Sequence, residues 1–366
     1  MANKYKFYQK SLKDLKSYDP HEIPHKIKLN ANENPYELPD GIIDEILIAA
    51  KNMKYSLYPN ANATELSSVL SESFGLSLDN IIIGNGSDEL IEYLIKAFTE
   101  KGKSIISPMP SFAMYKIYAA MHHADFIQIP LEQKNFSLNV DKLLEEAKKE
   151  TASLIFISYP NSPTANYFEI DKIIKILKES GCLVVVDEAY YEFGGKTFAP
   201  LIQKYENLVV LRTFSKAFSL ASLRVGYLLS NADVVKEIRK VKSPFNVNSF
   251  SQMAAQIVFK HREKLFRKIE KIVQERELLE NKINNFPSFK AHPSSTNFIF
   301  TEVGSLKEQE LVFNSLLEQG ILIQVVNASD FSSSRYFLRI TVGTREENIC
   351  LVNGLKYSQQ MIDKLL

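Results

Sequence analysis

The stretch CLVVVDEAYYEF, Cys182–Phe193, decides the fold that the chain is expected to adopt. Its apolar start is too short for a typical helix and does not alternate with polar residues, so it predicts a strand buried on both faces. Asp187 ends this run, and a carboxylate in that place needs a cationic or hydrogen-bonding partner. The stretch therefore predicts a buried sheet with a charged group at the carboxyl end of a strand.

Further apolar runs of strand length alternate with segments of helical periodicity on both sides of this stretch. They lie at residues 80–84, 104–107, 153–158, 207–211 and 225–229. This alternation is typical of an α/β domain, in which a mostly parallel central sheet is wrapped by helices.

The pattern changes near residue 249. Residues 249–286 contain neither proline nor glycine and predict one long helix that leads out of the large domain. Segments 296–303, 307–319, 320–326 and 336–343 and a last helix predict a smaller α+β domain. The expected division is an N-terminal arm (1–40), a large domain (41–249), and a linking helix with a small C-terminal domain (250–366).

Composition and charge exclude several classes of function. The net charge is +1 in 366 residues, which provides no overall field for binding nucleic acid or an anionic membrane. The first residues lack the apolar run of a signal peptide, and no window is long and apolar enough to span a membrane. The two cysteines and the adjacent pair His122 and His123 complete no metal-ligand pattern. We expect a cytoplasmic protein without a metal site.

Polar groups and glycines follow the predicted strands, where ligands bind in open α/β sheets. IIIGNGSDEL, residues 81–90, turns on two glycines and opens a helix, which favours an anion site as much as an ordinary capped turn. Phe112 is placed to stack on a flat ligand or to pack in the core. Asn161, between two prolines, is placed to offer an amide or to form a turn.

TFSKAFSLASLRVGY, residues 213–227, adds the most unusual group of side chains. It places two hydroxyls beside Lys216, and Arg224 eight residues later, among small and apolar neighbours where unpaired charges are costly. A phosphorylated, nitrogen-containing ring with an aldehyde would engage the lysine, the carboxylate, the anion-binding turn and the stacking ring together. The strand ends therefore indicate a site for such a cofactor.

The segments in question occur in the order of a known family. They are LNANENPYELP (29–39), YSLYPN (55–60), IIIGNGSDEL (81–90), PSFAMY (110–115), YPNSPTAN (159–166), VVVDEAYYEF (184–193), TFSKAFSLASLRVGY (213–227) and LRITVGTREEN (338–348). Over nearly its whole length the chain resembles the pyridoxal-phosphate-dependent aminotransferases of fold type I, class I/II, and more narrowly the histidinol-phosphate aminotransferases.

The resemblance implies a role for each matching residue around pyridoxal 5'-phosphate. The catalytic residues would be Lys216, which forms an imine and moves a proton, Asp187, which pairs with the pyridine nitrogen, and Tyr190. The cofactor's phosphate would be held by the turn at Gly86, Ser87 and Asp88 and by Thr213, Ser215 and Arg224. Tyr58 would bind the cofactor from the partner subunit. Phe112 would stack on the ring, while Asn161 and Tyr190 would hydrogen-bond its phenolic oxygen.

The resemblance also implies a homodimer with shared active sites and a ping-pong exchange of an amino group between L-histidinol phosphate and 2-oxoglutarate or glutamate, in histidine biosynthesis. Tyr18, Asn32 and Arg339 match positions that line the substrate. The group usually has a second arginine where this chain has Gln324, and Arg335 is placed to substitute because an even separation puts it on the same face of a strand as Arg339.

Other functions stay open at this level. They are an aminotransferase for another phosphorylated or aromatic substrate and a decarboxylase of a phosphorylated amino acid, because the cofactor motifs do not separate these reactions. A ligand-sensing transcription regulator would need a DNA-binding module, and about 30 residues before the NEN segment are too few for one. A dehydrogenase would need a GxGxxG turn, which no strand end carries.

Overall fold

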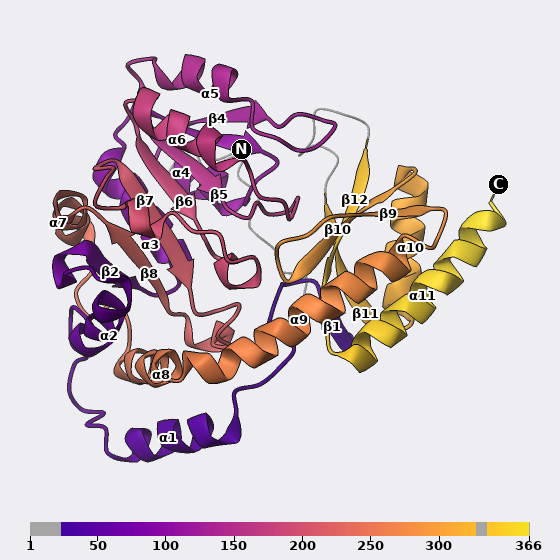
Figure 1. Cartoon of the computed structure of the whole chain (residues 1–366), viewed down its shortest axis with the longest axis horizontal. Helices are drawn as coiled ribbons and strands as arrows, with labels where there is room; N and C mark the ends of the chain where they lie inside the picture. Colours follow the sequence, from indigo (N-terminus) through magenta and orange to yellow (C-terminus); the bar gives the residue numbers. More distant parts are fainter. Residues whose placement is uncertain (1–22, 327–334, 366) are drawn as a thin grey trace, which may run out of the picture.

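The computed structural model describes residues 23–326 and 335–365 and shows a large and a small domain joined by a long helical segment (Figure 1). The large domain contains a seven-stranded sheet of order β2-β8-β7-β6-β5-β3-β4. Strands β3 to β7 pair in parallel, whereas β8 is antiparallel to both β2 and β7. The strands are β2 Ile81–Gly84, β3 Ser104–Met109, β4 Asp125–Pro130, β5 Ala152–Ser158, β6 Leu183–Asp187, β7 Leu208–Thr213 and β8 Gly226–Ser230.

Both faces of this sheet are covered by helices, which explains its continuous apolar strands. In β6, Val184 and Val186 belong to the core on one face and Val185 to the core on the other. One face packs against α3 Ser87–Phe98, α4 Met114–Met121 and α7 Ala232–Val241. The other packs against α2 Thr64–Phe74, α5 Val140–Ala147, α6 Ile170–Glu179 and α8 Ser249–Lys260. The predicted α/β class and mostly parallel sheet are confirmed.

The small domain is a five-stranded sheet of order β1-β11-β12-β10-β9, against which α10 and the helix α9, Arg262–Ile283, pack, while α11 packs on these helices. Its first strand comes from the N-terminal part of the chain and pairs in parallel with β11, whereas the other pairs are antiparallel. The elements are β1 Ile27–Leu29, β9 Phe289–His292, β10 Phe298–Val303, α10 Leu306–Glu318, β11 Ile321–Val326, β12 Tyr336–Thr341 and α11 Arg345–Asp363.

Helix α1, Asp40–Lys51, follows the segment after β1 and packs against α8. Short 3-10 helices occupy Leu78–Asn80, Tyr191–Phe193, Ala199–Leu201 and Ala221–Leu223. Strands β1, β4 and β9 are absent from the sequence-based prediction. Strand β4 lies at the sheet edge and is mostly half-exposed, so its residues Asp125–Pro130 do not form a continuous apolar run.

The prediction of one uninterrupted helix over residues 249–286 is wrong in detail. Helix α8 ends at Lys260, and α9 begins at Arg262 and ends at Ile283. His261, at the break, binds Glu45 of α1 with its side chain at 2.6 Å. Helix α8 packs against α1 and α2, whereas α9 packs against α11 and β9, so the break lies where the chain passes from one domain to the other.

Candidate active site

The carboxyl ends of neighbouring strands form one wall of a cavity in the large domain. Ser158, the last residue of β5, lies opposite Asp187, the last residue of β6, in the register of the parallel pair. Strand β7 ends next to them at Thr213. The cavity is lined by Ser87, Asp88, Phe112, Ser158, Ser162, Asp187, Ala189, Tyr190, Thr213, Ser215, Lys216 and Arg224. The structure thus brings together most of the residues that the sequence singled out.

Asp187 is the buried acid of this cavity, with 4% of its surface exposed. Its carboxylate accepts hydrogen bonds from the Tyr115 hydroxyl at 2.7 Å and from the Ala189 backbone N–H at 3.1 Å. Burial raises the pKa of Asp187 to about 6, although the hydrogen bond from Tyr115 opposes that rise. Among the residues that the structure describes, no basic side chain forms an ion pair with Asp187, so a cationic ligand atom would find a buried carboxylate here.

The opposite part of the cavity is built to receive an anion. Gly86 has a φ of +81°, and a Cβ there would lie 2.7 Å from Arg224 Nη2, so only glycine allows the guanidinium this close. Helix α3 begins at the next residue, Ser87, and its first backbone N–H groups have no partner within the helix. Arg224 binds Asp88 at 2.9 Å and donates to Ser215 Oγ at 3.2 Å. A helix N-terminus beside a guanidinium and hydroxyls is the arrangement that binds phosphate.

Lys216 provides the amine of the cavity. Its Nζ donates to the Ala31 carbonyl at 2.8 Å and lies 5.9 Å from the centre of the Tyr190 ring. Burial lowers the pKa of Lys216 to about 8, and the charge of Arg339 acts in the same direction. The lowered pKa makes the neutral form of this amine, which a nucleophile or a base needs, more accessible near neutral pH than that of an ordinary lysine.

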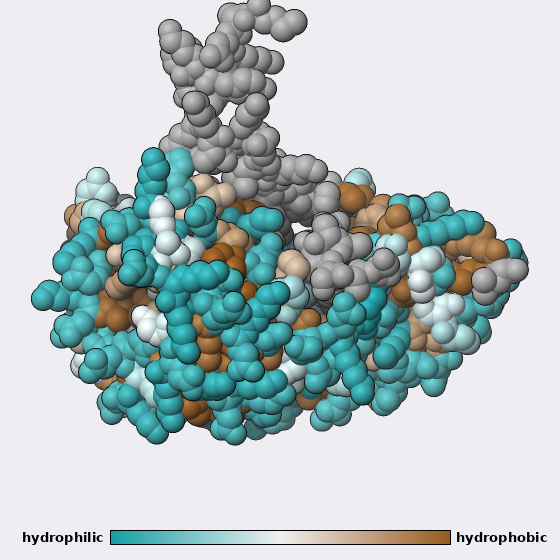
Figure 2. Space-filling view, turned by 90° about the horizontal axis from the view of Figure 1, so that it is seen from above, coloured by the Kyte–Doolittle hydropathy of each residue, from teal (hydrophilic) through white to brown (hydrophobic). Residues whose placement is uncertain are grey.

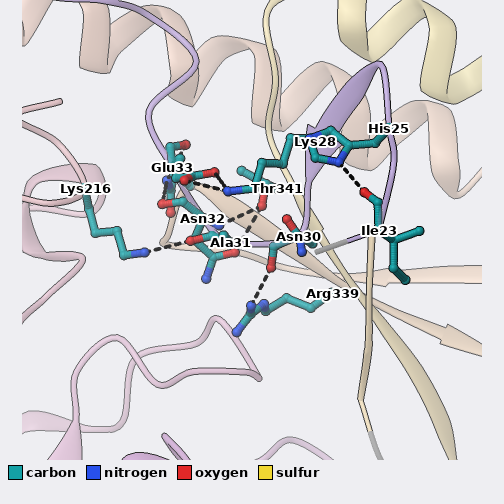
Figure 3. Close-up of polar contacts among 11 residues, drawn as sticks. Ile23, His25, Lys28, Asn30, Ala31, Asn32, Glu33, Lys216, Arg339 and Thr341 are labelled. Atoms are coloured by element: carbon teal, nitrogen blue, oxygen red, sulfur yellow. Dashed lines mark hydrogen bonds and ion pairs between the residues drawn. The ribbon is translucent and has the colours of Figure 1, made fainter. Parts of the chain in front are cut away.

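Residues 30–32 connect this amine to the small domain (Figure 3). Arg339 on β12 donates from Nη2 to the Asn30 carbonyl at 2.7 Å, and its guanidinium carbon lies 5.6 Å from the centre of the Phe298 ring. Asn32 is buried and donates from Nδ2 to the Tyr190 hydroxyl at 2.9 Å. Asn30, Ala31 and Asn32 thus contact Arg339, Lys216 and Tyr190, respectively.

Several predicted site residues lie elsewhere or are engaged within the protein. Asn161 is buried, donates to the Pro110 carbonyl and to Thr164, and is absent from the cavity lining. Tyr58 is 82% exposed and stacks on Phe245, with 4.7 Å between ring centres. Tyr18 lies outside the described residues.

Arg335 and Arg339 in the small domain differ in their partners. Arg335 binds Glu302 through Nε at 2.8 Å and Nη2 at 2.7 Å, and its Nη1 donates to the Gln133 carbonyl at 2.6 Å. Gln324 lies opposite Arg339 in the β11–β12 register, and its amide donates to the Val325 carbonyl. Arg335 would have to give up Glu302 before it could bind a substrate anion.

The sequence interpretation missed three residues at the site: Ser158, Ser162 and Tyr115. Ser158 could have been predicted from the sequence, because it ends a strand-length apolar run just as Asp187 does, and the two residues lie side by side in the sheet. Ser162 belongs to the segment that drew attention to Asn161. Tyr115 carries no signal in the sequence, because it is buried on α4, stacked on Phe156, and reaches Asp187 only through the tertiary fold.

Within residues 23–326 and 335–365, no three or more histidine, cysteine or acidic side chains are grouped so that they could hold a metal ion. None of the helices in the same ranges has the length and apolar character needed to cross a bilayer.

The chain is similar to known proteins over nearly its whole length. Residues 24–355 match the family model of aminotransferase class I and II. The chain is 40% identical over 352 residues to a histidinol-phosphate aminotransferase of Thermoanaerobacter pseudethanolicus, covering 95% of this chain and 97% of the relative. It is 41% identical over 353 residues to histidinol-phosphate aminotransferase 1 of Carboxydothermus hydrogenoformans, covering 96% and 99%.

Solved structures share the fold at lower identity. The histidinol-phosphate aminotransferase of Sinorhizobium meliloti, in complex with pyridoxal-5'-phosphate, superposes with a TM-score of 0.87 at 22% identity and covers 98% of each chain. The L-threonine-O-3-phosphate decarboxylase of Porphyromonas gingivalis gives a TM-score of 0.77 at 22% identity, with 91% of this chain and 99% of that chain covered. The family model and the close relatives together establish that the chain belongs to the class I and II aminotransferases, in the group formed by the histidinol-phosphate aminotransferases.

Proposed function

We propose that the protein is a pyridoxal-phosphate-dependent aminotransferase that exchanges an amino group between L-histidinol phosphate and 2-oxoglutarate in histidine biosynthesis. One observation carries the proposal: a buried carboxylate, an amine of lowered pKa and an anion-binding turn line a single cavity. The relatives that are about 40% identical along the chain have this activity in their names. Family, cavity and relatives all support the same class of reaction.

The residues of the cavity fit the cofactor at both of its ends. Asp187 offers a buried carboxylate to the pyridine nitrogen, whose positive charge would supply the partner that the acid needs. The phosphate would lie against Gly86, Ser87 and Asp88, with Thr213, Ser215 and Arg224 completing the cradle. Phe112 would stack on the ring, and Tyr190 would donate to its phenolic oxygen. Asn161 would reach that oxygen only if its amide gave up a present partner.

When bound, the cofactor supplies an aldehyde carbon that receives the amino group and a ring that withdraws electrons from the substrate. The chain's own residues do the rest. Lys216 Nζ, in the neutral form that its lowered pKa makes accessible, would accept the proton from the substrate carbon that bears the nitrogen and deliver it to the cofactor carbon that carried the aldehyde. Asp187 Oδ1 and Oδ2 hold the charge at the far end of the site, and the surrounding burial excludes water.

The substrate end lies toward the small domain. Arg339 would bind the phosphate of histidinol phosphate in one half-reaction and a carboxylate of glutamate in the other, because a guanidinium pairs with either anion. Asn32 and Tyr18 would line this end. Arg335 would join only by exchanging Glu302 for the substrate.

We further propose that two chains form a homodimer in the cytoplasm, with shared active sites. Helix α1 and the loop after it carry the exposed apolar residues Leu47, Ile48, Tyr55, Leu57 and Tyr58. Such a surface favours association with a second copy of the chain. In that dimer the Tyr58 side chain of one subunit would reach the phosphate site of the other. By contrast, the face in Figure 2 is mostly hydrophilic, with apolar residues in small scattered groups. Two free cysteines, Cys182 and Cys350, are compatible with a reducing compartment.

The reaction is tested by visible absorbance of the purified, cofactor-loaded protein. Adding L-histidinol phosphate without a keto acid should remove the yellow band, and 2-oxoglutarate should restore it. A yellow protein that ignores histidinol phosphate would overturn the named substrate while keeping the cofactor. A protein that takes up no pyridoxal phosphate would overturn the proposal as a whole.

The same samples test the decarboxylase alternative. Carbon dioxide release from a phosphorylated amino acid, without amino transfer to a keto acid, would favour a reaction like that of the Porphyromonas gingivalis protein. We expect no such release, because the relatives of 40% identity are aminotransferases and the decarboxylase shares the fold at 22% identity.

A further inference from the structure

Asn32 is fixed in place by burial and by hydrogen bonds of both its backbone and its side chain. Only 1% of its surface is exposed, and its backbone has a φ of +53°, in the left-handed region that asparagine tolerates better than most residues. Its backbone N–H donates to Thr341 Oγ1 at 3.0 Å, and its carbonyl accepts from Asn297 Nδ2 at 2.9 Å. The backbone of Asn32 is therefore fixed to the small domain on both sides.

The hydrogen bonds around Asn32 have only one consistent direction. A backbone N–H can only donate, so the Thr341 hydroxyl accepts from it and must send its own proton elsewhere. That proton has Asn32 Oδ1 as its acceptor, at 3.2 Å. The carboxamide oxygen thus faces Thr341, and Nδ2 is left to face the Tyr190 hydroxyl at 2.9 Å.

This direction determines the role of Tyr190. Because the amide Nδ2–H group cannot accept, the Tyr190 oxygen accepts from Asn32 and its proton must point away from it. Tyr190 lines the cavity, as does Ser162 beside it. The Tyr190 proton is therefore left for an acceptor on the cavity side, where Ser162 is a present hydrogen-bonding partner and a bound ligand would be another. Accepting one hydrogen bond strengthens the ability of the hydroxyl to donate the next.

Thr341 connects this tyrosine to the strand that carries Arg339. The two residues lie on the same face of β12, because their separation is even. Thr341 itself is absent from the cavity lining and has no hydrogen bond to Tyr190. A change at Thr341 can reach Tyr190 only through Asn32 or through a general loosening of the fold.

We infer that Asn32 is a positioning residue, which directs the Tyr190 proton into the cofactor cavity and transmits to it the placement of β12. The inference rests on the proposed function and adds to it a link between the substrate-binding strand and the phenol. The three charged groups around Tyr190 are Arg339 on β12, Asp187 at the end of β6 and Lys216 after β7. None of the variants proposed below removes any of them.

The test is a pH titration of the visible absorbance of cofactor-loaded protein. A donor to the phenolic oxygen of the cofactor stabilises the negative charge on that oxygen and therefore the deprotonated form, which lacks the yellow band. Weakening that donor should raise the apparent pKa at which the yellow band is lost. Thr341→Val, which keeps the shape but removes the hydroxyl, should raise it by several tenths of a unit, whereas the control Thr341→Ser should match the wild type. Asn32→Gly, which tolerates the positive φ, should raise it further.

Asn32→Asp is the sharpest variant. Its carboxylate keeps the size of the side chain but can only accept, so it would draw the Tyr190 proton out of the cavity and give the largest rise. In a Tyr190→Phe background Thr341→Val and Asn32→Gly should lose their effect, whereas Asn32→Asp should keep only the part of its rise that its added negative charge causes. Melting of the cofactor-free proteins shows whether a variant is folded.

The outcomes separate the inference from the proposed function. Absence of cofactor uptake by the wild type would overturn both. A shift on Tyr190→Phe, with none on Asn32→Gly or Thr341→Val, would overturn the inference alone. Shifts of equal size with and without the Tyr190 hydroxyl would do the same, because they would reflect a general structural role of Asn32.

Discussion

The two ends of the candidate site are built in different ways. The end around Asp187 and Ser87 consists of strand termini and a helix start within one domain, backed by a core that is buried on both faces. The end around Arg339 lies between the domains and uses the backbone carbonyls of residues 30 and 31 as partners. The first end is shaped by a sheet, whereas the second depends on how β12 meets the N-terminal segment. Variants at the first should alter chemistry and cofactor binding, and variants at the second should alter substrate affinity.

The largest effect is expected at the amine. Lys216→Ala removes the only group proposed to move the proton, so turnover should fall by at least about a thousandfold. Absorbance should still show bound cofactor, and a coupled glutamate assay gives the turnover. The control Lys240→Ala, which removes a surface lysine paired with Glu237, should be unchanged. Turnover near the wild-type level in Lys216→Ala would contradict the assignment.

Asp187→Asn should have opposite effects on activity and stability. Burial raises the pKa of Asp187 to about 6 from 3.8, so the folded protein holds this proton at a pH where the unfolded chain has lost it. The carboxylate therefore costs stability progressively as the pH rises from about 4 to 6, and the cost stays in full above that range.

We expect Asp187→Asn to lower turnover by about a hundredfold or more. It should also raise the free energy of unfolding of the cofactor-free protein at pH 7.5 by on the order of 2 kcal/mol, with little change near pH 4. Urea denaturation at the two pH values measures this, with the exposed Asp141→Asn as control. A loss of stability at pH 7.5 that exceeds the loss at pH 4 would mean that the carboxylate is stabilised in the empty fold.

At the second end, Arg339→Gln should mainly raise KM for the phosphorylated substrate. Loss of a charged hydrogen-bonding group should raise this KM roughly 10-fold to 100-fold. Arg335→Met should raise it less than about threefold, because the Arg335 guanidinium is already bound to Glu302. Steady-state kinetics give KM for both variants. Equal increases in KM would show that Arg335 leaves Glu302 to bind the substrate.

Tyr115→Phe should have only a small effect on turnover. It removes one of the two hydrogen bonds to Asp187 and should cost about 1–2 kcal/mol of stability at pH 7.5, with less than a tenfold change in turnover. The cost should shrink near pH 4, where Asp187 is protonated. Tyr118→Phe on the same helix is the matched control. Equal losses for the two variants would show that the hydrogen bond to Asp187 contributes little.

The comparison of the two ends also explains what the sequence could predict. Strands β5, β6 and β7 were found because burial on both faces produces a continuous apolar run, and the groups that follow each run then point to the cofactor end. The edge strand β4 and the three-residue β1 lack such a run. The break at His261 carries no proline or glycine and lies where the packing partners change from α1 and α2 to α11 and β9.

The substrate end was less predictable because its contacts are made between distant segments. The approach of Asn30 and Ala31 to Arg339 and Lys216 involves backbone carbonyls, which every residue has, so no side-chain pattern marks it. The pairing of Arg335 with Glu302 depends on the register of β10 and β12. The even spacing of Arg335 and Arg339 indicates a shared face, but it does not reveal a competing carboxylate on the neighbouring strand.

The pairing of β1 with β11 has a consequence for how the protein is made. The ribosome produces residues 27–29 long before residues 321–326, yet the two strands are neighbours in one sheet. The sheet of the small domain therefore cannot be completed until β11 has emerged, and closing such a distant contact is slow. During that time the large domain has to fold as an insertion between the two parts of its neighbour. A chain that lacked β1 would leave β11 as an open sheet edge, at which strands of other molecules could add.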